Sequence, residues 1–364
     1  MADPQVNLLG QDIYALGYVD SILPIHEKKT FQKQFLIINS YDLLVKNYDN
    51  FFSVDNPVSI FHGTNWRYTT LQIIDENSEV IWNGIIIDIV RNPVNKTALI
   101  QSRDGLFQYR KELIEYTSTA YETGAEAVKN IMDDYSYTDY NQNAIETSIT
   151  NLNDAGCTLK VDITKEDNVT LLQILDKLAV YCAADCYLHN NQVYFRHWIP
   201  YTGGTSIYLT ENDILDIIEI KSSENTLIND YNIGYDGDLG VSATDEDNND
   251  IGNASRLKYG IHSLPELRCD TSNSQIWFEN LASAVYIGES YIKRTNINYN
   301  TQPRPLTSFT ARLKYNIQSW ITLQTYCYVT FSDEGWNQKL FEIFEFTRDE
   351  SAHTLTATFY EVIT

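Results

Sequence analysis

Positively charged side chains are scarce in this sequence. Lys and Arg together number 26, against 49 Asp and Glu, which gives a formal net charge of −23 over 364 residues. Binding to a nucleic-acid backbone needs clustered Lys and Arg that neutralise phosphates. The composition therefore excludes an ordinary nucleic-acid-binding protein. Two interpretations of the acidity stay open: a surface kept soluble by charge repulsion, and a surface that must not hold DNA.

The sequence also lacks the long apolar runs of membrane and secreted proteins. Asp3, Asp12 and Asp20 interrupt the first twenty residues, so no signal peptide is expected. No run approaches the about 20 apolar residues of a transmembrane helix, because Ile85 to Val90 is short and contains Asp88. Cysteine is sparse as well. Five residues without regular spacing define no disulfide framework, which indicates assembly in a reducing cytoplasm.

Short catalytic motifs are missing too. The sequence has no Gly-x-Ser-x-Gly elbow and no P-loop, and the pair His26-Glu27 lacks the second histidine of a zincin helix. We therefore predict no catalytic residues and no enzyme. A glycosidase stays open as an alternative, because its two carboxylates can be far apart in sequence and still meet across a cleft.

One acidic loop invites comparison with a calcium site. It contains Asp245, Glu246, Asp247, Asn248, Asn249 and Asp250. An EF-hand loop needs glycine at its sixth position and glutamate at its twelfth. Counting from Asp245, these positions hold Asp250 and Arg256, and counting from Asp247 the twelfth is Lys258. The loop is therefore predicted to be solvated or to face a partner, without a bound metal.

A second group combines thiols and imidazoles. Cys182, Cys186, His189 and His197 are close in sequence, but they lack the compact Cys-x-x-Cys spacing of a zinc knuckle. Buried free cysteines on apolar faces are the commoner case. We predict no metal and no cofactor here.

Aromatic residues, in contrast, are abundant. The sequence contains 26 Tyr, 14 Phe and 6 Trp, and 43% of its residues are hydrophobic. Aromatic side chains favour half-buried pleated sheets. The length favours two or three domains with packed cores.

Alternating patterns predict strands in the first third. Tyr68 to Ile74, Glu79 to Val90 and Thr97 to Ser102 form a three-strand meander with polar turns between them. Gly84 within the long middle strand marks a bend where the sheet curves, which predicts a small barrel.

The periodicity changes to helical in the middle of the chain. Helices are predicted at Glu126 to Met132, Ala144 to Leu152 and Leu171 to Cys182, the last capped by Thr170. A hairpin about Asn190-Asn191 follows, formed by residues 186–188 and 193–195. Strands are then predicted at residues 207–209, 214–220 and 227–234.

The last third has a distinct order of elements. Ser255 to Ile261 reads SRLKYGI and is followed by an amphipathic run, Gln275 to Tyr291, for which Ser274 can cap a helix. After this helix, the chain alternates as strands to its end. These strands are predicted within residues 307–313, 326–330, 341–346 and 355–362, with a turn at Asp333-Glu334-Gly335.

This order resembles the phage tail hub proteins, the family that joins a tail tube to the spike or tip at its distal end, and the hubs of related injection machines. The likeness is carried by the Ser-x-x-x-Tyr-Gly element of residues 255–260, the helix after it and the strand-rich finish. The closing hairpin, residues 340–346 with 354–361, and the turn Arg103-Asp104-Gly105 match the ends of the two barrels of that family. Ile321 to Leu323 and Tyr328 to Thr330 match the family's entry into the last barrel.

The resemblance implies an α+β, mainly β fold with two tail-tube-like β-barrels and a helix and β-hairpin insertion. The domains it implies are a first barrel at 1–115, the insertion at 116–205, strands returning to the first barrel at 206–240, and a helix with the second barrel at 241–364.

The function implied is that of a structural virion protein at the baseplate or tip of a phage tail, assembled in the host cytoplasm. Two similar barrels in each of three chains would let a threefold spike or tip join a sixfold tube. The implied partners are further copies in a homotrimer, a tail tube or distal tail protein, and a spike or tip protein. DNA would pass through the lumen without specific binding. The alternative is a cell-wall or polysaccharide hydrolase, or a receptor-binding tail protein, that uses aromatic side chains to hold sugar.

Overall fold

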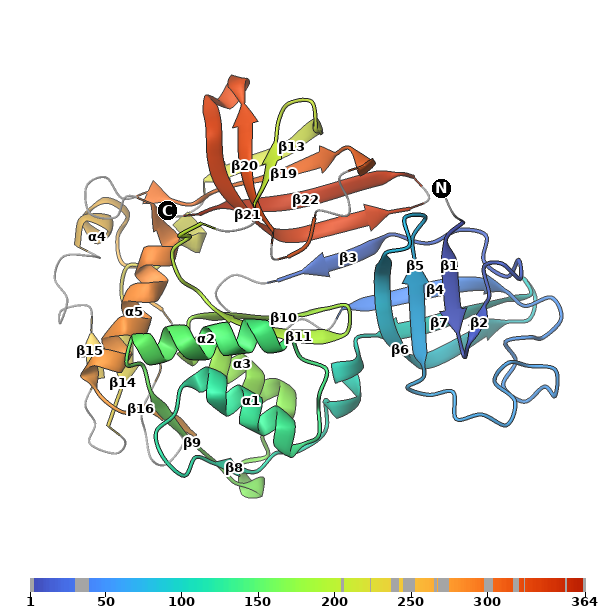
Figure 1. The fold of residues 1–364 in the computed structure, drawn as a ribbon, viewed down its shortest axis with the longest axis horizontal. Helices are drawn as coiled ribbons and strands as arrows, with labels where there is room; N and C mark the ends of the chain where they lie inside the picture. The colour runs from blue at the N-terminus through green and yellow to red at the C-terminus, as the bar shows by residue number, and fades with distance from the viewer. Residues whose placement is uncertain are drawn as a thin grey trace.

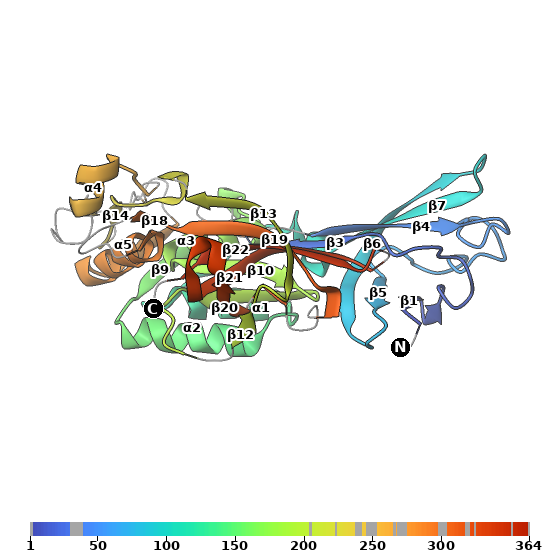
Figure 2. The same cartoon turned by 90° about the horizontal axis from the view of Figure 1, so that it is seen from above.

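The structure is a computed structural model. It describes residues 3–29, 39–203, 206–222, 224–236, 242–244, 253–264, 267, 275–297, 304–316, 321–323, 325–350 and 352–362. Two large sheets, the first antiparallel and the second mixed, and a helical layer make up most of this part of the chain, with the first sheet at one end of the molecule (Figures 1 and 2). Among the described helices, none is both long enough and apolar enough to span a lipid bilayer.

The first sheet confirms the predicted meander. Its strand order is β2-β1-β5-β6-β7-β4. The strands are β1 (Gln5–Leu8), β2 (Gln11–Asp12), β4 (Ser40–Lys46), β5 (Thr70–Ile74), β6 (Val80–Asn92) and β7 (Thr97–Arg103). Gly84 in β6 leaves room for the ring of Trp82, whose Nε1 donates to Ser102 Oγ at 3.1 Å. A Cβ at Gly84 would lie only 2.6 Å from that ring, so this position needs glycine.

The helical layer confirms the three predicted helices and the hairpin. The helices are α1 (Gly124–Asp134), α2 (Gln142–Asp154) and α3 (Leu171–Tyr181), and the hairpin is β10 (Ala184–His189) with β11 (Gln192–His197). Side chains of Thr123, Asn141 and Thr170 accept backbone hydrogen bonds at the three N-termini. A short sheet that was not predicted runs below them, with β8 (Tyr116–Thr117) and β9 (Leu159–Ile163). The alternation of Leu159, Val161 and Ile163, all buried, was the signal for β9.

The segment after the hairpin corrects a prediction. Residues 206–240 were expected to return to the first sheet, but β12 (Ser206–Leu209) pairs with β20 and β13 (Ile214–Ser222) pairs with β19, both in the second sheet. The cause is side-chain burial: Ile214 and Ile217 of β13 pack on the core of the second sheet. The strand β14 (Asn232–Gly234) pairs instead with β15 (Ser242–Thr244). Alternation predicts a strand, but it does not predict the partner.

The helix of the last third starts later than predicted. The expected helix began at Gln275, whereas β16 (Ile276–Phe278) pairs with β9 and α5 spans Leu281–Thr295. Asn280 ends the extended segment and caps α5, because its side chain accepts from the backbone N–H of Ser283 at 3.0 Å. The proposed cap Ser274 lies outside the described residues. Before this, α4 (Asn253–Tyr259) covers most of the SRLKYGI stretch.

The second sheet confirms the predicted strand-rich finish. Its order is β12-β20-β21-β22-β19-β13, and β3 (Ile25–Lys28) from the N-terminal region also pairs with β21. The C-terminal strands are β19 (Thr307–Leu313), β20 (Tyr326–Phe331), β21 (Trp336–Asp349) and β22 (Thr354–Glu361). Gly335, with φ 67°, closes the predicted turn after a 3₁₀ turn at Ser332–Glu334. Other short elements are 3₁₀ turns at Gly105–Tyr109, Lys165–Asp167 and Glu224–Thr226, and the pair β17 (Asn296–Ile297) with β18 (Arg304–Pro305).

Three separate hydrophobic cores hold these parts together. One lies in the first sheet, one in the second sheet, and the third joins the helical layer to α5 and β16. The predicted fold class is confirmed: an α+β protein, mainly β, in which a helix and hairpin insertion lies between two β units (Figure 1). The predicted domain boundaries, apart from the correction above, stay a prediction.

Candidate functional site at the junction of the sheets

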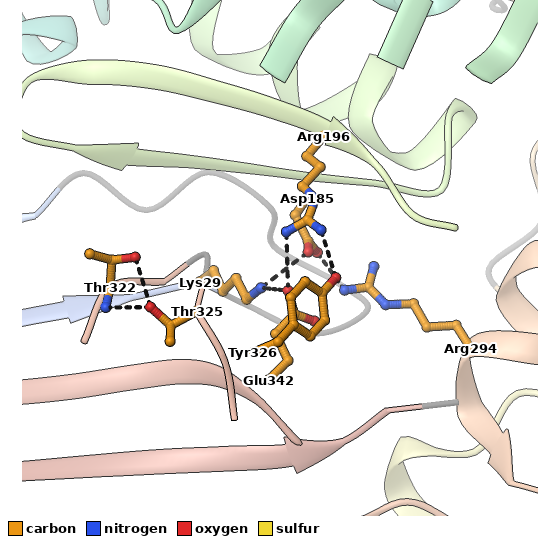
Figure 3. A network of polar contacts seen from close by, with 8 residues as sticks. All are labelled: Lys29, Asp185, Arg196, Arg294, Thr322, Thr325, Tyr326 and Glu342. Carbon is orange, nitrogen blue, oxygen red and sulfur yellow. Dashed lines mark hydrogen bonds and ion pairs between the residues drawn. The ribbon is translucent and has the colours of Figure 1, made fainter. Parts of the chain in front are cut away.

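A cluster of buried charges lies where four parts of the chain meet. Figure 3 shows these side chains converging from the end of β3, the hairpin β10–β11, helix α5 and the strands β20 and β21. The members are Lys29, Asp185, Arg196, Arg294, Tyr326 and Glu342. We call this set the charge junction.

Lys29 is at the centre of the charge junction. Its Nζ donates to Glu342 Oε1 at 2.5 Å and lies 3.4 Å from Asp185 Oδ2, and its side chain is only 1% exposed. The ammonium also lies 4.4 Å from the ring centroid of Phe344, a favourable position over an aromatic face. Lys29 therefore joins the hairpin of the helical layer to the second sheet.

Two arginines complete the charge junction. Arg294 Nη2 of α5 donates to Asp185 Oδ1 at 2.7 Å. Arg196 Nη2 donates to Tyr326 Oη at 2.7 Å, and its Nη1 lies 3.6 Å from Glu342 Oε1. Three cations thus surround two carboxylates, and every partner comes from a different element. Such a network costs desolvation energy, but it also fixes one arrangement of the parts that meet there.

Electrostatics favour the ionised form of Asp185 in the charge junction. Burial alone would raise the pKa of Asp185, but Arg294 and Lys29 outweigh burial and hold that pKa below its ordinary value. Burial raises the pKa of Tyr326 well above its ordinary value, so its hydroxyl stays protonated. Asp185 and Glu342 are each 4% exposed at the side chain. They are therefore closed to a saccharide, which a glycosidase pair must reach across an open cleft.

A second group of contacts joins the first sheet to the hairpin turn. Asp104 Oδ2 accepts from the backbone N–H of Asn39 at 2.7 Å, and Asn39 Nδ2 donates to Leu188 O at 3.2 Å. Gly105 N donates to Asn191 Oδ1. The sequence predicted only a turn at Asp104-Gly105, and the structure shows that this turn also docks the first sheet on the hairpin.

Beside this contact, Glu27 and His189 form an ion pair, and both residues line a cavity of about 290 Å³. His189 Nδ1 lies 2.6 Å from Glu27 Oε2. Burial lowers the pKa of His189, but Glu27 outweighs it, so the pKa lies above its ordinary value. In the buried carboxyl of Asp104, burial raises the pKa to about 8. Both groups therefore hold a proton more strongly in the folded chain.

These two shifts predict that stability falls as pH rises toward 8. Between its ordinary pKa and about 8, Asp104 is protonated in the folded chain and ionised in the unfolded chain. The pKa of His189 is raised in the folded chain. Its contribution to stability is therefore fully present at pH values below the ordinary pKa of histidine, and it is lost as pH rises through the folded-state pKa. The folded state thus binds more protons, so the free energy of unfolding decreases with pH.

Asp104→Asn is expected to flatten this pH dependence, because an amide oxygen can still accept from Asn39 without ionising. Urea unfolding of both proteins at pH 5, 6.5 and 8 measures the difference. Asp88→Asn, at an exposed carboxylate, is the matched control. Equal pH slopes for wild type and Asp104→Asn would contradict the prediction.

The thiol and imidazole group of the sequence has structural partners. His197 Nδ1 lies 2.5 Å from the carbonyl oxygen of Cys182, and its Nε2 lies 2.9 Å from Tyr286 Oη. Burial lowers the pKa of His197 to about 4, so it is neutral at pH 7. Cys182 and Cys186 are buried free thiols. Within the described ranges, His, Cys, Asp and Glu form no group placed to hold a metal ion. The acidic loop 245–250 lies outside them.

The SRLKYGI stretch is held by one buried asparagine. Asn229 Nδ2 donates to Ser255 Oγ at 3.2 Å and to Gly260 O at 2.9 Å, while Asn229 Oδ1 accepts from the backbone of His262 at 2.8 Å. Ser255 in turn donates to Asn296 Oδ1 at 2.7 Å, at the end of α5. Gly260, with φ 79°, ends α4. The serine and the glycine therefore serve to dock α4 beside α5.

Comparison with known proteins identifies the fold. No protein-family model matches the sequence, and no curated protein matches it. Among solved structures, the chain is similar to the 43 kDa tail protein of prophage MuSo2 from Shewanella oneidensis, with 12% identity, a TM-score of 0.57, and coverage of 99% of this chain and 98% of that one. A tail protein from Neisseria meningitidis MC58 is similar with 11% identity and a TM-score of 0.55, over 99% of this chain and 96% of that one.

Prophage tail protein gp18 from Listeria monocytogenes EGD-e is similar over 99% of this chain and 94% of that one, with 9% identity and a TM-score of 0.55. The likeness thus spans both chains nearly end to end. It confirms that this chain has the fold of phage tail proteins.

Proposed function

We propose that this chain is a structural protein of a phage tail, the hub at its distal end. The observation that carries this proposal is the length of the structural likeness. Three tail proteins match over at least 94% of their own chains, so the likeness runs along the whole chain and is not limited to one shared module. At 9 to 12% identity, the likeness itself defines only the fold.

The proposed mechanism is geometric. The described part of the chain has two large β-sheets, so three copies in a ring would present six β units to a sixfold tail tube and a threefold face to a spike or tip. The charge junction supports this role, because it fixes the hairpin, α5 and the second sheet in one arrangement. A net charge of −23 suits a channel wall that repels passing DNA. The proposed location is the tail baseplate or tip of the virion, and no catalytic activity is proposed.

Imaging of the purified particle tests this proposal. Cryo-electron microscopy, or crosslinking with mass spectrometry, is expected to place three copies between the tail tube or distal tail protein and the spike or tip protein. Neighbours other than these would overturn the proposal. Release of reducing sugar from a bacterial cell wall by the purified chain would also overturn it, in favour of a hydrolase.

A further inference from the structure

Two open grooves on this chain have similar volumes and opposite charge. The first, about 510 Å³, lies between the loop after β4 and the β6–β7 turn, and Arg91 and Lys96 line it. The second, about 570 Å³, lies between β8 and the end of α1, and Glu115, Glu122, Asp133 and Asp134 line it. Of the described residues lining each groove, none carries the opposite charge. We call them the basic groove and the acidic groove.

The cations of the basic groove are weakly neutralised within the chain. Arg91 Nη2 lies 3.9 Å from Asp55 Oδ2, and the Asp55 side chain is 90% exposed, so water screens this pair. Lys96 is exposed and forms no ion pair with the described acidic residues. Tyr48, 65% exposed, lines the same groove. An exposed tyrosine beside arginine is typical of protein interfaces.

Two carboxylates of the acidic groove are held in place by hydrogen bonds. Glu122 accepts from Tyr116 Oη at 2.8 Å and from Asn130 Nδ2 at 2.9 Å. Asp133 accepts from Tyr140 Oη at 2.7 Å. Glu115 lies 3.5 Å from Lys165 Nζ, but both side chains are more than half exposed. The groove therefore presents fixed negative charge next to Tyr121, which is 38% exposed.

We propose that the basic groove of one copy binds the acidic groove of a second copy of this chain. Charge complementarity, similar groove volumes and a tyrosine on each side support this occupant. The two grooves are formed by different elements: the β6–β7 turn of the first sheet borders the basic groove, and β8 and the end of α1 border the acidic groove. These elements lie apart in the ribbon view (Figure 1). Contact between them is thus head-to-tail, and such contacts form a ring when the rotation between neighbouring copies closes. This proposal rests on the self-association that the proposed function includes, and it specifies which two surfaces are in contact.

Charge reversal with rescue tests the contact. The variants are Arg91→Glu with Lys96→Glu, Glu115→Lys with Asp134→Lys, and the combination of all four. Size-exclusion chromatography with light scattering at 50 mM salt is expected to show an oligomer for wild type. Each double variant should associate at least about tenfold more weakly, because like charges then face each other. The fourfold variant should regain the wild-type mass, since its grooves are again complementary.

The matched control is Lys111→Glu with Lys221→Glu, which changes two exposed lysines and shifts the net charge by the same amount as reversal of the basic groove. It should assemble as wild type does. Wild-type assembly should weaken as salt rises to 500 mM. Thermal melts show whether each variant is folded.

Three outcomes would overturn this contact: a wild-type chain that stays monomeric, double variants that assemble like wild type, or a fourfold variant that stays dissociated. A monomeric wild type would also be the result if another acidic protein filled the basic groove. Imaging of the particle decides separately whether the chain lies at the tail tip. A chain that lies there but fails the reversal test would lose this contact and keep its proposed function.

Discussion

Asp185→Ala is expected to lower the free energy of unfolding by about 3–5 kcal/mol, since it leaves the buried Arg294 without its carboxylate and Lys29 with Glu342 alone. Arg294 donates to Asp185 at 2.7 Å, and Lys29 lies 3.4 Å from it. Their side chains are 7% and 1% exposed, so water cannot replace the lost partner. The damage should extend to the contact of the hairpin with the second sheet, because Lys29 spans both.

Urea unfolding at pH 7 measures this loss. Asp216→Ala, at an exposed carboxylate of β13, should change stability by less than about 0.5 kcal/mol. The pH dependence gives a second measurement. Arg294 and Lys29 hold the pKa of Asp185 below its ordinary value. Wild type therefore loses stability as pH falls from the ordinary pKa of aspartate through the lower folded-state pKa, and the variant should lose less. A loss below about 1 kcal/mol at pH 7 would show that the charge junction does not stabilise the fold.

Phe309→Ala is expected to cost about 3–5 kcal/mol in the second sheet, through lost burial and the cavity that remains. Phe309 of β19 is 1% exposed and stacks on Phe359 with ring centroids 4.4 Å apart. Phe341 and Trp336 lie at 4.8 Å and 5.1 Å from it. Four aromatic rings from three strands thus share one cluster, which cannot close over the missing ring without moving the strands.

Hydrogen exchange shows which part of the chain loses stability in Phe309→Ala. Because the two sheets have separate cores, protection should fall in β19 to β22 and stay nearly unchanged in β5 to β7. Thr310→Ala, one residue along β19 on the opposite face, is the control and should cost about 1 kcal/mol or less. Equal loss of protection in both sheets would show that the predicted domains unfold as one unit.

Much of the fold was predictable from local patterns. The meander of β5 to β7, the three helices α1 to α3 and the hairpin at Asn190-Asn191 all follow from periodicity, caps and turn residues within short windows. The closing strands were predictable for the same reason. The start of α5 was not, because apolar residues of β16 continue the helical register and hide the boundary at Asn280.

The candidate site was not predictable from the sequence. Lys29, Asp185, Arg294 and Glu342 are separated by up to 313 residues, and each is an ordinary charged residue in its own segment. The one local signal is a charged residue at an inward position, as with Asp185 within the apolar strand β10. The pairing of β13 was predicted wrongly for the same reason. Its isoleucines indicate a strand, but they do not specify β19 as the partner strand.

The sequence by itself determined the class of the protein: acidic, rich in aromatic residues, mainly β, with a helix and hairpin insertion between two strand-rich regions and an order of elements resembling tail hubs. These features depend on composition and on contacts between near neighbours. Only the tertiary structure decided which strands share a sheet, where the buried charges meet and which grooves lie open. Those depend on contacts between residues far apart in the chain, whose energies are set by burial and charge after the parts have come together.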